Sequence, residues 1–378
     1  MKKLLLASAV SALFAAPATV LAQAKPPAVP TLDKVLEASG ISVSGYIDAG
    51  YTHSDRNIEA GIGGPPSVPP RVFDNQNNSF ALHQVGLTVA KQPKEGFGGL
   101  VNLTMGTDAQ VIHSSSLGTF ADTSMFDVTQ AFAQYAGGPL TLIAGKFATL
   151  HGTEVIASSG NTNISRSILF GSVPFTHTGL RATWALGDTV SLIAGVNNGW
   201  DQITDTNKGK TVELGATLAP IKPLSIALSG YSGKEGATPN EGTRTSLNAV
   251  ASYTIIDPLS VGLEVLTVSQ EKFTSLVNAS TIKAKYSGVA GYVTFMASPK
   301  FRTVVRIESF TDKDGLRFGT ADTKYKEVTL TGAYVASDSF EARVEARRDQ
   351  ATNTVFTDYA GAASKTMTTL ALQGLYKF

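Results

Sequence analysis

The sequence predicts an all-β protein, a 16-stranded antiparallel transmembrane β-barrel with short periplasmic turns and long extracellular loops. Three observations lead to this prediction. Apolar and polar residues alternate with a period of two from Ile41 onward, most alternating segments are about ten to thirteen residues long, and short connections alternate with long ones. Successive strand residues point to opposite faces of a sheet. Segments of this length suit a tilted strand that crosses a bilayer.

Residues 1–24 are predicted to form a secretory signal peptide. A short positive start precedes an apolar run over residues 4–14, and small residues allow cleavage after Ala22 or after Ala24. An apolar run of this length is too short to span a bilayer and fits the core of a cleaved export signal. The sequence therefore predicts an exported protein.

Residues 25–40 are predicted to form an N-terminal linker and a short helix. Three prolines within residues 25–30 favour an extended chain, and the helix is expected from Thr31 to Ser39, ended by Gly40. The barrel is then expected over residues 41–378.

Sixteen segments with strand periodicity follow. In the fifteenth, the apolar residues Phe340, Ala342 and Val344 share one parity, and the charged residues Glu341 and Arg343 stand between them. Such a segment has one apolar face and one charged face. The predicted strands cover residues 41–52, 79–91, 96–107, 126–136, 140–148, 175–186, 189–199, 210–219, 223–233, 243–256, 259–268, 284–297, 300–311, 325–336, 339–349 and 366–378.

The connections between these segments alternate strictly in length. Seven are very short and consist mostly of residues that form tight turns; they fall at residues 92–95, 137–139, 187–188, 220–222, 257–258, 298–299 and 337–338. Eight longer polar connections fall at residues 53–78, 108–125, 149–174, 200–209, 234–242, 269–283, 312–324 and 350–365. Short turns on one side and long loops on the other are typical of outer-membrane barrels, whereas a soluble sandwich has no reason to separate them.

Composition argues against several classes of function. Only 16% of the 378 residues are charged, the formal net charge is +1, and the sequence contains no cysteine. A nucleic-acid binder is therefore not expected, nor is a disulfide scaffold, a thiolate metal site or a cysteine nucleophile. The five histidines show no metal-binding spacing, and no Gly-x-Ser-x-Gly elbow or phosphate-binding loop occurs. We expect no enzyme and no cofactor; a lipase or protease would need serine and histidine that meet only in the fold.

The export signal, the sixteen hairpin-linked strands and the Leu-Tyr-Lys-Phe ending resemble Gram-negative outer-membrane porins. Within that group the sequence resembles the OmpL-like β-barrel porins. The stretches that carry this likeness are residues 37–48, 163–167, 174–181 and 197–201. The resemblance implies a channel in the cell outer membrane, reached through the inner membrane with a cleaved signal peptide. It also implies that the barrel-assembly machinery reads the terminal Phe378.

A barrel of sixteen strands is too wide for its side chains to fill, so an aqueous lumen is expected. Residues on the polar parity of each strand should line it. The expected pore-lining residues of the wall are Lys146, Arg181, Arg302, Arg306, Glu308, Glu341, Arg343, Glu345 and Arg347. These arginines either form a basic ladder facing Glu154 or are neutralised locally by Glu308, Glu341 and Glu345 in an ion-pair mesh. The mesh is the favoured interpretation, and it predicts no strong ion preference.

The third long connection, residues 149–174, is the expected constriction loop. It is too apolar for a loop that extends into water. Folding inward would bury Ile168, Leu169 and Phe170 against the wall and point Glu154 and Arg166 at the passage. In the general porins the constriction loop likewise follows the fifth strand. An outward surface lobe is the alternative. Charges at a constriction set ion preference.

Together these features predict a passive diffusion channel for ions and small hydrophilic solutes. The alternative is a surface adhesin or scaffold whose pore is occluded. The expected partners are outer-membrane lipid, the barrel-assembly machinery through Phe378 and small hydrophilic solutes, with no nucleic acid. The sequence leaves open the preferred solute, the size limit and whether the barrel works alone or as a homotrimer.

Overall fold

The computed structural model describes residues 31–57, 71–74, 76–112, 124–236, 242–274 and 279–378. The predicted signal peptide at residues 1–24 lies outside these ranges, and so do linker residues 25–30. The chain divides into two units, Met1–Ser39 and Gly40–Phe378.

The described part of the first unit is the helix α1 (Leu32–Ser39). The Val35 N–H donates to the Thr31 carbonyl at 3.1 Å, and Gly40 follows with a φ of 67°. A glycine in this left-handed conformation ends a helix without the steric cost that a side chain would bring. Among the described residues, no helix has the length and apolar character needed to cross a membrane.

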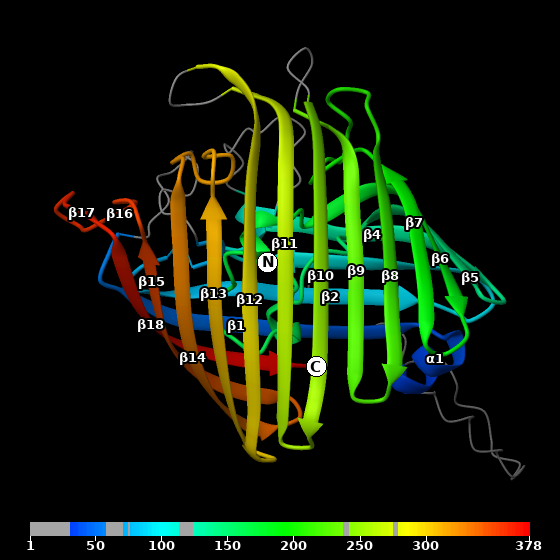
Figure 1. The fold of residues 1–378 in the computed structure, drawn as a ribbon. Helices are drawn as coiled ribbons and strands as arrows, with labels where there is room; N and C mark the ends of the chain where they lie inside the picture. The colour runs from blue at the N-terminus through cyan, green and yellow to red at the C-terminus, as the bar shows by residue number, and fades with distance from the viewer. Residues whose placement is uncertain (1–30, 58–70, 75, 113–123, 237–241, 275–278) are drawn as a thin grey trace, which may run out of the picture. The chain divides into compact units, whose positions relative to one another are not determined.

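Within the described part of the second unit, sixteen antiparallel strands close into a barrel (Figure 1). The predicted fold class is confirmed. The barrel strands are β1 (Ser42–Ser54), β2 (Ser79–Lys91), β3 (Gly96–Met105), β4 (Phe126–Gly137), β5 (Leu140–Ala148), β6 (Thr176–Leu186), β7 (Val190–Asn197), β8 (Thr211–Ile221), β9 (Leu224–Glu235), β10 (Gly242–Ile256), β11 (Leu259–Thr274), β12 (Thr281–Ser298), β13 (Phe301–Asp312), β14 (Thr323–Ser337), β15 (Phe340–Ala351) and β18 (Thr366–Lys377).

Each strand pairs with its neighbours in sequence, and β1 pairs with β18 to close the ring. The terminal residue extends this seam, because the Phe378 N–H donates to the Gly45 carbonyl at 2.9 Å and the Gly45 N–H donates back at 2.8 Å. Closure matters physically, since an unpaired backbone group in lipid costs several kcal/mol and an open edge would present a row of them.

The two faces of the sheet differ as the period-two pattern predicts. Along β15 buried and exposed residues alternate: Glu341, Arg343 and Glu345 are buried, whereas Val344 and Ala346 are exposed. Exposed aromatic side chains gather at the strand ends near the short turns. Phe97 packs beside Tyr135 at 5.0 Å between ring centroids, and Phe301 beside Tyr334 at 5.1 Å. Such a belt is typical of a membrane interface.

The largest departure from the predicted boundaries lies between β11 and β12. The predicted connection at residues 269–283 is shorter in the structure, because β11 continues to Thr274 and β12 begins at Thr281. A bulge between Gln270 and Phe273 interrupts the register, with Lys272 at a φ of 53°. The bulge and the polar residues around it break the period-two pattern, so the sequence does not predict that β11 and β12 extend this far.

Further short elements lie in the long connections. They are the helix α2 (Ala109–Ile112), the 3-10 helices η1 (Ser158–Gly160) and η2 (Phe170–Ser172), and a hairpin of β16 (Phe356–Thr357) and β17 (Ala363–Ser364). None of them was predicted, because elements of two to four residues carry too little periodicity to be seen.

Candidate functional site

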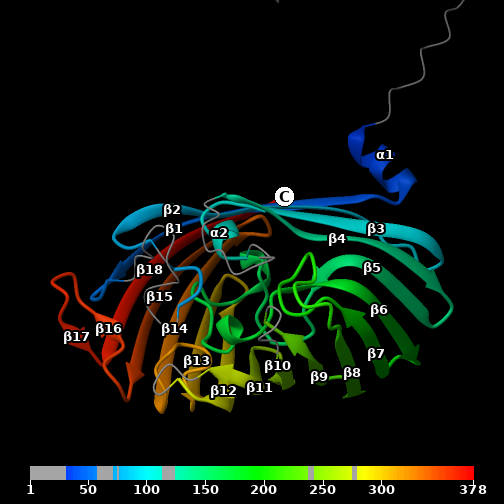
Figure 2. The same cartoon turned by 90° about the horizontal axis from the view of Figure 1, so that it is seen from above.

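Residues 149–174 connect β5 to β6 and contact the inward-facing side chains of the barrel wall; we call them the inner segment. Its two ends meet where the Thr149 N–H donates to the Phe175 carbonyl at 3.1 Å. Figure 2 shows its green ribbon within the ring of strands. Its contacts reach from β9 to β15 and, on the other side, to β2, where Gln84 accepts the Ser158 N–H at 3.0 Å.

The apolar residues of the inner segment form part of a core inside the barrel. Ile168 and Leu169 are fully buried, and Phe170 is nearly so. Ile168 and Leu169 pack with wall residues that include Leu266 of β11 and Phe310 of β13. Full burial of a side chain of this size contributes about 1.5–3 kcal/mol. The apolar run that made this connection unusual in the sequence thus holds the segment against the wall.

Two wall glutamates hold the backbone of the inner segment. Glu308 of β13 accepts hydrogen bonds from the N–H groups of Ile168 and Leu169, both at 2.7 Å. Glu345 of β15 accepts from the N–H groups of Ile164 at 2.7 Å and Ser165 at 2.9 Å. Bonds from an amide to a carboxylate are stronger than those between neutral groups. Each glutamate therefore fixes two consecutive peptide groups.

Two wall arginines hold carbonyl oxygens of the same segment. Arg306 of β13 donates to the Ser165 carbonyl at 2.8 Å, and Arg347 of β15 donates to the Arg166 carbonyl at 2.5 Å. Both side chains are fully buried. Arg306 also forms ion pairs with Glu154 at 2.7 Å and with Glu327 of β14 at 3.1 Å. Arg306 thus links the inner segment to the wall through one ion pair on each side.

Glu154 and Arg166, the two residues expected at the passage, are 8% and 3% exposed. Glu154 pairs with Arg306 and accepts the Ser167 N–H at 2.6 Å. Arg166 donates to carbonyls of its own segment, those of Val155 at 3.1 Å, Ile156 at 2.9 Å and Ile164 at 3.1 Å. In this structure Arg166 thus ties the inner segment to itself. Burial lowers the pKa of its guanidinium, and the charge of Glu154 offsets part of that effect.

The beginning of the inner segment is held by β9, β10 and β11. His151 is buried, with Nδ1 at 2.7 Å from Ser229 Oγ and Nε2 at 2.8 Å from Ser246 Oγ. Glu264 of β11 accepts the Thr153 N–H at 3.0 Å. Burial, and to a smaller extent the neighbouring His177, lowers the pKa of His151 to about 3. Its imidazole is therefore neutral at neutral pH and acts as a fixed hydrogen-bonding group.

The remaining basic residues expected on the wall each have an acidic partner. Lys146 lies 3.3 Å from Asp127, Arg181 lies 2.6 Å from Glu213, and Arg343 lies 2.6 Å from Glu341. Arg302 also pairs with Glu341. Arg347 pairs with Asp349 at 2.7 Å. This arrangement is an ion-pair mesh and not a free basic ladder. Its acids differ in part from those expected, because Glu308 and Glu345 bind backbone N–H groups and form no ion pair among the described residues.

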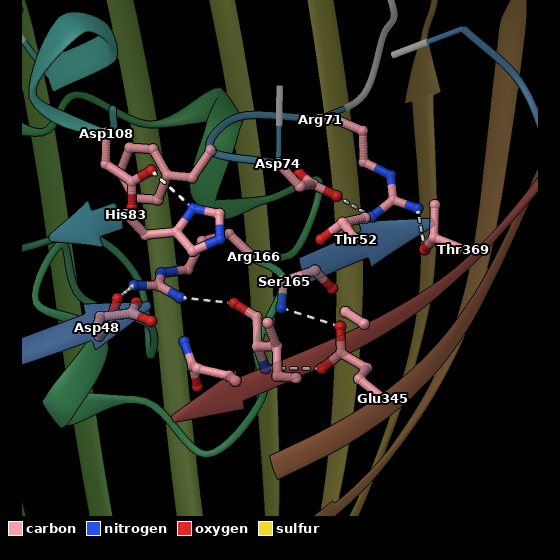
Figure 3. A pocket seen from close by; sticks show the side chains of 15 residues that line it. Asp48, Thr52, Arg71, Asp74, His83, Asp108, Ser165, Arg166, Glu345 and Thr369 are labelled. Carbon is pink, nitrogen blue, oxygen red and sulfur yellow. Dashed lines mark hydrogen bonds and ion pairs between the residues drawn. The ribbon is translucent and has the colours of Figure 1, made fainter. Parts of the chain in front are cut away.

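A small cavity lies between the inner segment and the strands β1, β2 and β18 (Figure 3). Its volume is about 20 Å³, room for about one water. Arg71, from the first long connection, reaches Asp349 at 3.0 Å and Thr369 at 2.8 Å. On the other side His83 lies 3.7 Å from Asp108. In the described part of the chain, no three histidine, aspartate or glutamate side chains are placed to hold a metal ion.

Residues 40–378 match the family model described as putative beta-barrel porin-2, OmpL-like. This match covers most of the chain. The chain belongs to this family. No curated protein matches the chain.

Solved outer-membrane proteins share the fold of this porin. The channel DcaP of Acinetobacter baumannii is 13% identical, with a TM-score of 0.60 over 89% of this chain and 97% of that chain. The anion-selective porin from Comamonas acidovorans is 10% identical, with a TM-score of 0.60 over 89% and 99%. The trimer form of OmpT from Vibrio cholerae is 11% identical, with a TM-score of 0.59 over 89% and 99%.

The protein is an outer-membrane porin, a channel for passive diffusion. Family and fold indicate a channel and not an enzyme. The alternative of an occluded adhesin or scaffold is not favoured.

Several residues of this porin's interior were missed in the sequence. Glu327, the wall partner of Arg306, lies on the inward parity of β14 but was not singled out. Arg71 and Asp108 lie in long connections, where no periodicity marks the inward side. His83 lies on β2, where a bulge interrupts the register with β1. For Glu327 the alternation of Tyr325, Glu327 and Thr329 was an available signal. For Arg71 and Asp108 the sequence carries none.

Proposed function

We propose that the inner segment is the constriction of this porin, and that ions and small hydrophilic solutes diffuse through the part of the lumen that it leaves open. The observation that carries the proposal is the fastening of its backbone by Glu308 and Glu345, four hydrogen bonds of 2.7–2.9 Å. A connection that extended outside the barrel would not form these hydrogen bonds with carboxylates of the inner wall. In this proposal the wall charges, together with Glu154 and Arg166, act by holding the inner segment in place and so set the width of the passage.

We further propose that this passage discriminates weakly between cations and anions. Support comes from the pairing of the wall charges, because a neutralised charge pair exerts a smaller field on a passing ion than a single charge. A transverse basic ladder would require arginines that have no carboxylate partner. Arg181, Arg306 and Arg347 each form an ion pair with a carboxylate.

Purified porin in a planar bilayer should give stable ohmic current steps. A salt gradient should then give a reversal potential close to zero, because neither ion is strongly excluded. A barrel that folds, as judged by its heat-modifiable migration on gels, but stays electrically silent would contradict the channel. A reversal potential near the Nernst limit for one ion would contradict weak selectivity while leaving the channel intact.

We also propose that the porin assembles as a homotrimer through the outer surface of β2–β5. A groove of about 570 Å³ lies there, lined by small residues such as Gly98, Gly99, Ala133 and Ala144. Small side chains let two barrel walls approach closely. OmpT of Vibrio cholerae, which shares the fold, has a trimer form.

Ala133→Trp is expected to convert the trimer to monomers, because the indole fills the groove and remains compatible with lipid. Light scattering after size exclusion in mild detergent measures the mass. The control is Ala251→Trp on β10, a position of the same outward parity as Leu247. A parent protein of monomer mass would refute the trimer, and an Ala133→Trp trimer would refute this interface.

A further inference from the structure

A second and larger cavity lies at the long-loop side of the barrel, next to the end of the inner segment. Its volume is about 380 Å³, within the range of small-molecule sites. Residues 171–173 form one side of it. The other sides come from the connection after β7, the ends of β9, β10 and β12, and the connection after β13. The side chains that carry the argument are Trp200, Gln202, Arg244, Tyr286 and Arg317.

Two arginines line this cavity without a carboxylate partner. Among the described residues, neither Arg244 nor Arg317 lies within 4.0 Å of an acidic oxygen, in contrast to Arg306 and the other arginines of the wall mesh. Arg244 donates through Nε to Gln270 at 2.8 Å. Arg317 donates to the Gly171 carbonyl, through Nε at 2.7 Å. Both terminal nitrogens of Arg244 and one of Arg317 find no hydrogen-bond acceptor in the described part of the chain.

Two acids, Asp201 and Glu235, also line the cavity, and both accept hydrogen bonds from other groups. Asp201 Oδ1 accepts the N–H groups of Phe175 at 2.8 Å and Thr176 at 2.9 Å. Glu235 accepts the Trp200 N–H at 3.1 Å and the Thr211 hydroxyl at 3.1 Å. These carboxylates order the connection after β7 and lie farther than 4.0 Å from the guanidinium nitrogens of Arg244 and Arg317. The unused hydrogen bonds in the cavity are therefore mostly donors on cations.

The aromatic rings of Trp200 and Tyr286 form two sides of the cavity. The Arg244 guanidinium lies 4.8 Å from the centre of the Trp200 ring. Tyr286 is held in place because its hydroxyl donates to the Ser172 carbonyl at 2.7 Å. Gln202 adds a buried amide oxygen, Oε1, for which the described residues offer no donor. The cavity thus combines two guanidinium groups, aromatic surfaces and one orphan acceptor.

We propose that this cavity is a capture site for small carboxylate solutes that carry a flat apolar group. The carboxylate binds the free N–H groups of Arg244 and Arg317, which match its planar shape. The apolar group lies against Trp200 and Tyr286, and a hydroxyl or amide N–H of the solute donates to Gln202. Residues 171–173 place the captured solute beside the inner segment. The inference rests on the proposed channel and adds a solute class to it.

The test uses 3-phenyllactate, which has a carboxylate, a hydroxyl and a phenyl ring, and its neutral counterpart 3-phenylpropane-1,2-diol. Each is added to the long-loop side of single porin channels in a bilayer. Phenyllactate should interrupt the ion current with saturable dependence on concentration, whereas the diol should not. Arg244→Gln and Arg317→Gln should each weaken the apparent affinity about tenfold or more, since each removes charge-assisted hydrogen bonds.

Arg244→Lys keeps the charge but loses the planar fork, so an intermediate loss of affinity is expected. The matched control is Arg348→Gln on β15, an arginine that is exposed and lies on the outward parity. It should leave the interruption unchanged. Equal interruption by the diol, or affinity unaltered in both Arg244→Gln and Arg317→Gln, would overturn the capture site. The absence of any ion current in the parent would instead overturn the channel itself.

Discussion

Replacing Arg306 by methionine is expected to loosen the inner segment and raise the single-channel conductance. Arg306 is fully buried and holds Glu154 at 2.7 Å, Glu327 at 3.1 Å and the Ser165 carbonyl at 2.8 Å. Its loss leaves Glu154 without an ion pair among the described residues and leaves Glu327 with only the longer contact to Arg347 at 3.7 Å. Removing one partner of a buried ion pair destabilises a protein by about 3–5 kcal/mol. Planar-bilayer recordings measure the conductance, and urea unfolding of the detergent-solubilised barrel measures stability.

The control for this change is Arg348→Met, because Arg348 is exposed on the outward parity of β15 and forms no ion pair within the described residues. It should change the free energy of unfolding by about 0.5 kcal/mol or less. Adding Glu154→Gln to Arg306→Met should recover part of the lost stability, since the buried charge that lost its ion pair is gone. The explanation fails if Arg306→Met leaves both conductance and unfolding as in the parent.

The barrel itself could be predicted because lipid imposes a strict pattern on sequence. Each strand needs an apolar face, so Val344 and Ala346 alternate with Glu345 and Arg347. Short turns lie at one end of the barrel and long connections at the other. The parity also predicts which side of the sheet each charge occupies. The short connections could be located to within a few residues because Gly, Pro and Asp mark tight turns.

The partners inside the barrel could not be predicted, because they depend on register and on the path of a long connection. Arg306 faces Thr329 across the ladder, and its ion pair with Glu327 is a diagonal contact two residues away. Parity alone does not distinguish that pair from one with Glu308. Arg166 shows a second limit. Its guanidinium donates hydrogen bonds to backbone carbonyls of its own segment. The sequence shows that this residue is charged, but it does not show which carbonyl groups will accept from it.

The double variant Glu308→Ala/Glu345→Ala is expected to release the inner segment from the wall. Four backbone N–H groups, those of Ile164, Ser165, Ile168 and Leu169, lose their acceptors. A buried donor left without an acceptor costs about 1–3 kcal/mol, so the segment should move to water where its amides are solvated. The conductance should rise, and the current should become noisier as the segment moves.

The position of the segment can be read directly, because the chain contains no cysteine. Ser167 is fully buried. A Ser167→Cys thiol should therefore resist a water-soluble thiosulfonate reagent in the otherwise unchanged porin and react readily in the Glu308→Ala/Glu345→Ala background. The Glu308→Gln/Glu345→Gln background keeps one of the two accepting oxygens at each position, so its thiol should react at an intermediate rate. Equal labelling rates in all three backgrounds would show that these glutamates do not hold the segment, and that the apolar contacts of Ile168 and Leu169 are sufficient.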